Sequence, residues 1–304
     1  MDHPNEGFHS GFVAVVGRPN VGKSTLLNYL LKQKIAAVSP RAQTTRRRQL
    51  GILTSEKAQI IFVDTPGIHN PVHKLGEFMN QVALDALRDA DVILWLVDAS
   101  VKPTTEDRLV AERLAQVRAG QVVLVGLNKI DLVIEDQRAS RLDAYQDLVP
   151  EAEFHSLSAI NGEGCSDLLA ALLARLPEGP PLYDEEQVTD LYEREIAVDL
   201  IREAILRHLK DEVPHATAVR MDEYKDREDN VAYIAATLMV ERETHKGIVI
   251  GKGGEMLKKI GMTARQEIEE MSGRKVFLEL HVKVLENWRN NPILLKQLGY
   301  RPEK

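Results

Sequence analysis

The stretch GRPNVGKST at residues 17–25 constrains the fold of this chain more than any other. It follows the apolar run FVAVV, and it leads into STLLNYLL, which we expect to be a helix. The spacing of Gly17, Gly22, Lys23 and Ser24 is that of a phosphate-binding loop between a strand and a helix. In such a loop, backbone N–H groups surround phosphate oxygens and the helix N-terminus adds positive potential. A nucleotide site is therefore predicted here, although a Gly-rich turn can also arise by chance.

Two side chains of this loop have specific predicted roles. Lys23 is expected to reach the β- and γ-phosphates, and the Ser24 hydroxyl is expected to bind Mg²⁺. The nucleotide-binding residues predicted on the loop are Gly17, Asn20, Val21, Gly22, Lys23, Ser24 and Thr25.

Up to residue 176 the chain alternates short apolar runs with helix-like segments. Uninterrupted β-rich runs, each followed by a helix, predict an α/β domain with a mainly parallel sheet that is buried on both faces. The expected strands lie at 12–16, 58–64, 92–98, 122–128 and 153–159, and the expected helices near 24–31, 75–90, 104–118, 136–148 and 164–176.

A Pro- and Gly-containing stretch ends this alternation. We assign 1–176 to a nucleotide-binding domain, 177–190 to a linker and 191–304 to a second, smaller α+β domain with a short C-terminal helix. The second domain is expected to run helix, strand, strand, helix, helix, strand. Its predicted elements are 191–210, 217–225, 231–241, 246–250, 254–271 and 275–285.

Two motifs at strand ends select guanine over adenine. In NKID at 128–131, the Asp131 carboxylate can accept both N1–H and N2–H₂ of guanine, a donor pair that adenine lacks. Asn128 is expected to support the base and its loop, while the methylenes of Lys129 cover the ring. In SAING at 158–162, Ser158 and Ala159 complete the pocket, and the Ala159 N–H is expected to meet guanine O6. Both motifs fall at the edge where open parallel sheets bind ligands.

DTPG at 64–67 predicts the magnesium and γ-phosphate end of the site. Asp64 is expected to hold Mg²⁺, and the Gly67 N–H to sense the γ-phosphate. A first switch loop at 39–48 should supply one Thr to the metal when GTP is bound. Ile68 stands where Ras-like enzymes carry a Gln that orients water, so hydrolysis is expected to be slow or to use another group.

The second domain contains the loop motif of a KH module. Gly251 and Gly254 bracket Lys252 and Gly253 between two expected helices, and such a loop clamps about four nucleotides of single-stranded nucleic acid. The order of elements around it is that of a type II KH fold. The residues predicted to bind RNA are Ile250, Gly251, Lys252, Gly253, Gly254 and Lys258, with Ile248, Ile250 and Leu257 as an apolar groove floor.

Composition and charge limit the partners and the cellular compartment that we expect for this chain. The net charge of −7 argues against a broadly basic nucleic-acid binder, yet residues 246–275 carry seven Lys or Arg against four Asp or Glu. The single cysteine, Cys165, fits a reducing cytoplasm. The N-terminal stretch does not have the pattern of a signal peptide, and no apolar run reaches the length of a membrane span.

Together, the five nucleotide motifs, the TTR sequence at 44–46 and the C-terminal KH pattern make the chain resemble the bacterial Era-type GTPases over essentially its whole length. The resemblance implies a GTPase that uses GTP/GDP and Mg²⁺ and acts in small ribosomal subunit assembly. Its partners would be the 3′ end of 16S rRNA and the small subunit. It also implies a monomer and a peripheral association with the inner face of the cell membrane.

The resemblance adds two roles within the nucleotide site. Related GTPases place the metal-binding Thr directly before an Arg, which selects Thr45 over Thr44 and makes Ser24, Thr45 and Asp64 the Mg²⁺ ligands. Relatives with the sequence PNxGKS use the Asn to hold K⁺, which points to Asn20. The predicted catalytic residues are Lys23, Thr45, Asp64 and Gly67.

Two functions remain open at this point. One is an enzyme, a slow GTPase whose nucleotide state controls RNA binding. The other is an RNA-binding assembly scaffold in which GTP is a structural ligand with negligible turnover, and Ile68 favours this second function.

Overall fold

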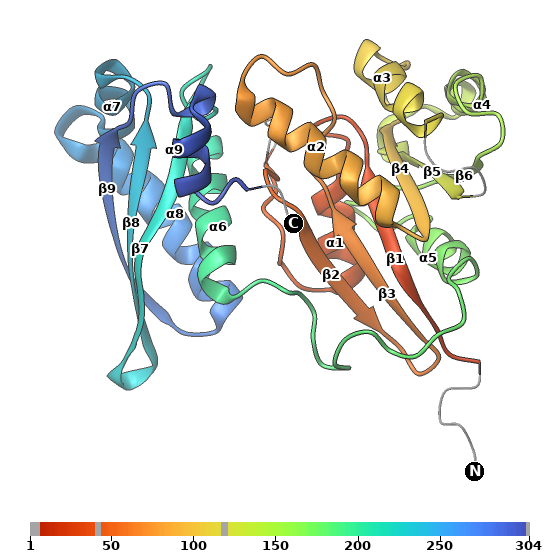
Figure 1. Ribbon diagram of the computed structural model, residues 1–304, viewed down its shortest axis with the longest axis horizontal. Coiled ribbons are helices and arrows are strands. Elements are labelled where there is room, and N and C mark those ends of the chain that lie inside the picture. Colours follow the sequence, from red (N-terminus) through yellow and green to blue (C-terminus); the bar gives the residue numbers. More distant parts are fainter. Residues whose placement is uncertain (1–6, 40–43, 117–120, 302–304) are drawn as a thin grey trace. The chain divides into compact units, whose positions relative to one another are not determined.

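The computed structural model describes residues 7–39, 44–116 and 121–301. These residues form two compact units, the first built mainly from the chain up to Asp190 and the second mainly from Leu191 onwards (Figure 1). No helix within the described ranges is long and apolar enough to cross a membrane.

The first unit contains a six-stranded sheet with the strand order β2-β3-β1-β4-β5-β6. All neighbouring strands are parallel except β2, which runs antiparallel to β3. The predicted mainly parallel sheet is thus confirmed. Its strands are β1 (His9–Val16), β2 (Gln49–Thr54), β3 (Ala58–Asp64), β4 (Val92–Asp98), β5 (Val122–Asn128) and β6 (Glu153–Ser156).

Helices cover both faces of this sheet because alternate residues of each strand point to opposite sides. Val13 and Val15 of β1 pack in one apolar cluster with α1 and α5, while Ala14 and Val16 pack in another with α2, α3 and α4. The helices of this unit are α1 (Lys23–Leu31), α2 (Lys74–Asp89), α3 (Thr105–Leu114), α4 (Glu135–Gln146), α5 (Cys165–Leu173) and the short η1 (Ile130–Leu132).

Strand β2 is absent from the strands expected on sequence. Its sequence, QLGILT, follows three arginines and contains a Gly, which weakens a strand signal. The structure explains the Gly: a Cβ on Gly51 would lie 2.7 Å from Leu31 Cδ1 and 2.8 Å from Leu27 Cδ1. A side chain at this position would push the two leucines aside, so Gly51 allows α1 to pack closely against the strand.

The segment expected to be a linker lies along the edge of the sheet in the first unit. The Ile52 N–H donates to Val188 O at 2.8 Å, and the Leu50 N–H donates to the Asp190 carboxylate at 3.0 Å. These bonds satisfy outward-facing groups of the edge strand β2, which an open edge would leave available for pairing with another chain.

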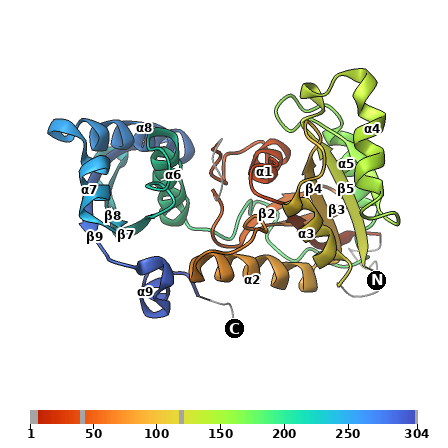
Figure 2. The same ribbon diagram turned by 90° about the horizontal axis from the view of Figure 1, so that it is seen from above.

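The second unit is a three-stranded sheet with α6, α7 and α8 on one face (Figure 2). Strand β8 pairs antiparallel with β7 and parallel with β9. The order helix, strand, strand, helix, helix, strand is the predicted one. Its elements are α6 (Glu193–His208), β7 (Thr217–Arg227), η2 (Glu228–Asn230), β8 (Val231–Val240), α7 (Glu243–Ile250), η3 (Lys252–Gly254), α8 (Glu255–Ser272), β9 (Lys275–Val284), η4 (Trp288–Asn290) and α9 (Pro292–Gln297).

Gln59 generates a stability prediction. It is fully buried in β3, where Oε1 accepts the N–H groups of Leu182 (2.7 Å) and Tyr183 (2.9 Å) and Nε2 donates to Tyr183 O (2.9 Å). Gln59→Met removes these bonds at nearly constant volume and leaves buried backbone groups unpaired. We expect a loss of about 2 kcal/mol in the free energy of unfolding of the first unit, measured by urea denaturation. The control Gln81→Met changes an exposed residue of α2 and should shift this free energy by less than about 0.5 kcal/mol.

Candidate functional site

The predicted nucleotide motifs meet at one edge of the first sheet. Strands β1, β3, β4, β5 and β6 are parallel, so their carboxyl ends lie on the same side. The phosphate-binding loop follows β1, Asp64 ends β3, Asn128 ends β5, and the SAING loop follows β6. Residues that are far apart in the sequence are therefore assembled at the edge where open α/β sheets bind ligands.

The loop between β1 and α1 has the backbone of a phosphate-binding turn. Gly17, Asn20 and Gly22 have φ angles of 149°, 65° and 102°, all in the left-handed region. A Cβ on Gly22 would lie 2.3 Å from the Asn128 side-chain nitrogen, so the loop can approach Asn128 only without a side chain there. Asn20 is exposed at the bend, and its predicted contact with K⁺ stays a prediction.

Lys23 is a buried cation at the start of α1. Its Nζ donates to the carbonyl oxygens of Gly17 and Arg18, both at 3.2 Å. Burial lowers the Lys23 pKa to about 8; the nearby Asp64 carboxylate opposes this shift, and the Arg18 guanidinium adds to it. A buried ammonium that donates to carbonyl oxygens is well suited to bind phosphate oxygens instead.

The predicted magnesium ligands form a tight triangle. Ser24 Oγ donates to Asp64 Oδ2 at 2.9 Å, Thr45 Oγ1 donates to the same oxygen at 3.0 Å, and the two hydroxyls lie 3.1 Å apart. Asp64 is fully buried. Two hydroxyls and one carboxylate are hard oxygen ligands of the kind that Mg²⁺ takes in nucleotide sites. These residues fit a Mg²⁺ ion whose remaining ligands are water and phosphate.

Asn128 joins the phosphate-binding loop to the predicted base loop. Its Nδ2 donates to Val21 O at 2.7 Å, and its Oδ1 accepts the Ala159 N–H at 2.9 Å. The sequence assigned this Ala159 N–H to guanine O6, whereas in the structure it donates to Asn128. Ser158 is buried beside it, and its N–H donates to Glu163 O at 2.9 Å. Asp131, by contrast, is exposed, as a group that meets an incoming base must be.

Arg18 and Asp98, which sequence reasoning missed, complete this network of contacts. Lys129 Nζ donates to Asp98 Oδ2 at 2.6 Å, and the Arg18 guanidinium lies 3.5 Å from the same oxygen. Arg18 Nε also donates to buried Asp107 at 3.2 Å. Burial raises the Asp98 pKa, but hydrogen bonds from Lys129 and Ser100 outweigh it and hold this pKa below its usual value. The position of Asp98 at the end of an apolar run, as for Asp64, is the signal that could have identified it.

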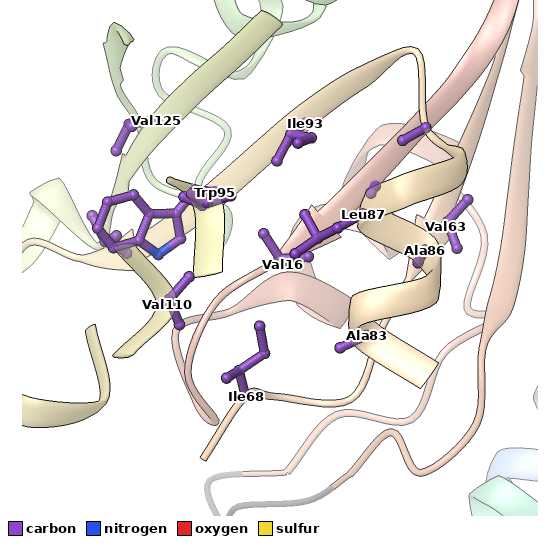
Figure 3. Packing of buried hydrophobic residues seen from close by; sticks show 14 of the residues in the cluster. Val16, Val63, Ile68, Ala83, Ala86, Leu87, Ile93, Trp95, Val110 and Val125 are labelled. Atoms are coloured by element: carbon purple, nitrogen blue, oxygen red, sulfur yellow. The ribbon is translucent and has the colours of Figure 1, made fainter. Parts of the chain in front are cut away.

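Ile68 lies in the hydrophobic core and not in the nucleotide site. Its side chain is 2% exposed and packs in the cluster that contains Val16 and Ala83 (Figure 3). Its N–H donates to Gly17 O at 3.2 Å, which holds the DTPG segment against the phosphate-binding loop. A Cβ on Gly67 would lie 2.6 Å from Pro19 N, so this close approach also requires Gly.

The glycine loop of the second unit is open to solvent. Gly251, Gly253 and Gly254 have φ angles of 72°, 60° and 83°. A Cβ on Gly251 would lie 2.7 Å from Met256 Cβ, whereas at Gly253 and Gly254 it would meet nothing within 4 Å. The first glycine is thus required by packing, while the next two leave backbone accessible to a ligand. Gly254 is also the N-cap of α8, and as a glycine it has no side chain to cap the helix.

A groove of about 390 Å³ runs from this loop between α8 and β9. Of the predicted RNA-binding residues, Gly254 and Lys258 line it. The predicted apolar floor is only partly right: Leu257 lines the groove, but Ile248 and Ile250 of α7 do not, and Ile248 is 49% exposed. The full lining is Gly254, Leu257, Lys258, Gly261, Met262, Arg265, Leu278 and Leu280. Arg265, missed on sequence, lies on the same side of α8 as Lys258, two turns along.

Two family descriptions match the two units. The family "50S ribosome-binding GTPase" matches residues 12–129, and the family "KH domain" matches residues 212–289. The chain is 45% identical to the GTPase Era of Ruminiclostridium cellulolyticum over 297 residues, which is 98% of this chain and 99% of the relative. It is 48% identical to the GTPase Era of Geotalea uraniireducens over 293 residues, covering 96% and 98% of the two chains.

Two solved structures are similar over nearly the full length. One is Era in complex with MgGDPNP and nucleotides 1506–1542 of 16S ribosomal RNA, with a TM-score of 0.92, 40% identity and coverage of 96% of this chain and 99% of that one. The other is an Era variant from Aquifex aeolicus bound to GDP and AlF4⁻, with a TM-score of 0.91, 40% identity and the same coverage.

The contact between Gly22 and Asn128 generates a prediction about nucleotide affinity. In Gly22→Ala the new Cβ would clash with the Asn128 amide and force a side chain into the left-handed region. Backbone strain of this kind costs about 1–3 kcal/mol. We therefore expect at least about a tenfold loss of affinity for a fluorescent guanine nucleotide. Gly253→Ala, also at a positive φ but in open space, should leave this affinity unchanged. An unaltered affinity in Gly22→Ala would contradict the described loop geometry.

Proposed function

This chain belongs to the Era family of GTPases, and we propose that it binds and hydrolyses GTP in its first unit and binds the 3′ end of 16S rRNA through its second. In this proposal it acts in the assembly of the small ribosomal subunit. Support comes from relatives that match both units at 45% and 48% identity, and from a similar Era structure that holds a GTP analogue, Mg²⁺ and 16S rRNA.

The observation that carries the nucleotide proposal is that the hydroxyls of Ser24 and Thr45 both donate to one carboxylate oxygen of Asp64, near Lys23. These three side chains would hold Mg²⁺, and the ion would neutralise charge on the β- and γ-phosphate oxygens. Lys23 would exchange its two carbonyl acceptors for phosphate oxygens. The Gly67 N–H, held close to the loop, would contact the γ-phosphate.

Guanine selection is assigned to the loops that Asn128 joins. Asp131 accepts the two donors of guanine, and Lys129, anchored by Asp98, lies along the ring. Ser158 and Ala159 form the far wall. Because the Ala159 N–H donates to Asn128 Oδ1, a contact with O6 would share or replace that bond.

The orientation of Ile68 bears on the rate of turnover. Its side chain is in the core, so the position that carries a water-orienting Gln in Ras-like enzymes supplies no polar group here. We propose slow hydrolysis for this reason. The same observation favours the second candidate function, an RNA-binding scaffold in which GTP is bound but hardly hydrolysed.

RNA binding is assigned to the groove between α8 and β9. The open backbone at Gly253 and Gly254 would approach phosphates, together with the N-terminus of α8. Lys258 and Arg265 add positive charge along one side, while Leu257 and two leucines of β9 give an apolar surface for bases. This combination of a phosphate clamp and an apolar groove is typical of KH modules.

The domain division that we propose is 1–176 for the GTPase domain, 177–190 for the linker and 191–304 for the KH domain. The linker segment is bonded to the sheet edge through Ile52 and Leu50, which gives it a fixed path along the first unit. We propose a cytoplasmic monomer, consistent with a chain whose single cysteine, Cys165, is buried. Association with the inner face of the membrane stays a prediction from the family resemblance.

The guanine pocket is tested by Asp131→Asn. The Asn amide loses one acceptor for guanine but can donate to the O2 of xanthine, so affinity for GTP should fall by about a hundredfold or more while affinity for xanthosine triphosphate rises. Isothermal titration with both nucleotides measures this exchange. Asp136→Asn, which changes an exposed carboxylate on α4, is the matched control and should behave as wild type. Full GTP affinity in Asp131→Asn would rule out the assigned pocket.

The RNA site is tested by Gly253→Asp, which places an anion where phosphate must approach. We expect at least about a tenfold loss of affinity for a single-stranded 16S 3′-end oligonucleotide, measured by fluorescence anisotropy, because charge-assisted hydrogen bonds contribute about 1.5–3 kcal/mol. Gly273→Asp is the matched control, since Gly273 also has a positive φ and open space but caps the opposite end of α8. Equal RNA affinities of the two variants would refute the assigned groove.

A further inference from the structure

The dipeptide Ile35–Ala36 is a fixed point at the start of the segment that leads to Thr45. Both residues are buried, 2% and 1% exposed, and Ile35 packs in the cluster formed by α1, α5 and the sheet. The Asn28 side chain, one turn after Ser24 on α1, makes three bonds to them. Its Oδ1 accepts the N–H groups of Ile35 (3.1 Å) and Ala36 (2.9 Å), and its Nδ2 donates to Ala36 O (2.8 Å).

Gln49, which follows Thr45 in the sequence, also bonds to Ile35. It is the first residue of β2, it is 4% exposed, and its Nε2 donates to Ile35 O at 2.5 Å. In the β2–β3 pairing Gln49 lies directly opposite Asp64. The residue that accepts Thr45 and the residue that bonds Ile35 are thus cross-strand neighbours.

Thr45 stands four residues before Gln49, on the chain that these contacts anchor. Because Gln49 is bonded to Ile35 O and lies opposite Asp64, the short stretch from Thr45 to Gln49 is fixed at its second end. Fewer conformations then compete with the one that brings Thr45 Oγ1 to 3.0 Å from Asp64 Oδ2. Without the bond from Gln49, Ile35 O would be a buried acceptor without its side-chain donor, and Gln49 itself would be held less firmly at the end of the stretch that carries Thr45.

We propose that Gln49, together with Asn28, is a positioning residue for Thr45 and thereby sets the preference of the site for GTP over GDP. The proposal rests on the proposed function, in which Thr45 completes the magnesium coordination when the γ-phosphate is present. GDP binding uses Lys23, Ser24 and the base loop, and none of these requires Thr45 to be in place. Loosening Thr45 therefore weakens GTP binding selectively.

The test is Gln49→Met, which removes the donor to Ile35 O at nearly constant volume. Affinities for a non-hydrolysable GTP analogue and for GDP are measured in Mg²⁺ by fluorescence competition. We expect the GTP-to-GDP affinity ratio to fall about tenfold, with GDP affinity within about twofold of wild type. Asn28→Ala should shift the ratio in the same direction.

Two controls separate positioning from general destabilisation. Gln59→Met removes another buried Gln from the same sheet, distant from Thr45 in the chain, and should leave the ratio unchanged. In a Thr45→Ala background, Gln49→Met should have no further effect on the ratio, because a residue that acts through Thr45 cannot act without it.

The outcomes distinguish this proposal from the proposed function. Failure of the wild-type chain to bind GTP would refute the function itself. Normal GTP binding by wild type, with an unchanged ratio in Gln49→Met, would overturn only the positioning role. The same conclusion would follow if the ratio fell equally with and without Thr45, or if Gln59→Met lowered it as much.

Discussion

The side chain of Asn128 joins two loops, one centred 107 residues before it in the sequence at Val21 and the other 31 residues after it at Ala159. Its amide donates to Val21 O in the phosphate-binding loop and accepts the Ala159 N–H in the SAING loop, at 2.7 and 2.9 Å. Gly22 must lack a side chain for the first contact to form. The phosphate and base ends of a nucleotide site are thus held at a fixed separation by one buried residue.

Around this link, each loop is tied to a neighbour by charge or by a backbone bond. Arg18, beside Gly17, contacts Asp98 and Asp107, and Asp98 in turn holds Lys129. The Ile68 N–H binds Gly17 O, while the Ile68 side chain fills the core. Preorganisation of this kind lowers the cost of binding a charged ligand, since few groups have to be ordered when it arrives. It also accounts for an Ile at a position where Ras-like enzymes use a polar side chain.

The motifs that carry chemistry were predictable because their residue types and spacing are demanded by phosphate, Mg²⁺ and guanine. Gly22, Ser24, Asp64 and Asn128 were predicted in this way, as were the mainly parallel sheet and the glycine loop at 251–254. What escaped prediction depends on contacts between distant segments. Strand β2 contains Gly51 for the sake of packing against α1, the roles of Arg18 and Asp98 appear only when β4 lies beside β1, and the groove uses β9 where α7 was expected.

The central claim is that the chain is an enzyme and not only a scaffold, and single-turnover hydrolysis of GTP tests it most directly. The full chain is mixed with GTP and Mg²⁺, with and without a single-stranded RNA of the 16S 3′ end, and GDP is followed over hours. The account predicts slow formation of GDP in at least one of these reactions and its absence when Lys23 is replaced by Ala. Bound GTP that is recovered intact in both reactions would contradict the account and leave the scaffold function.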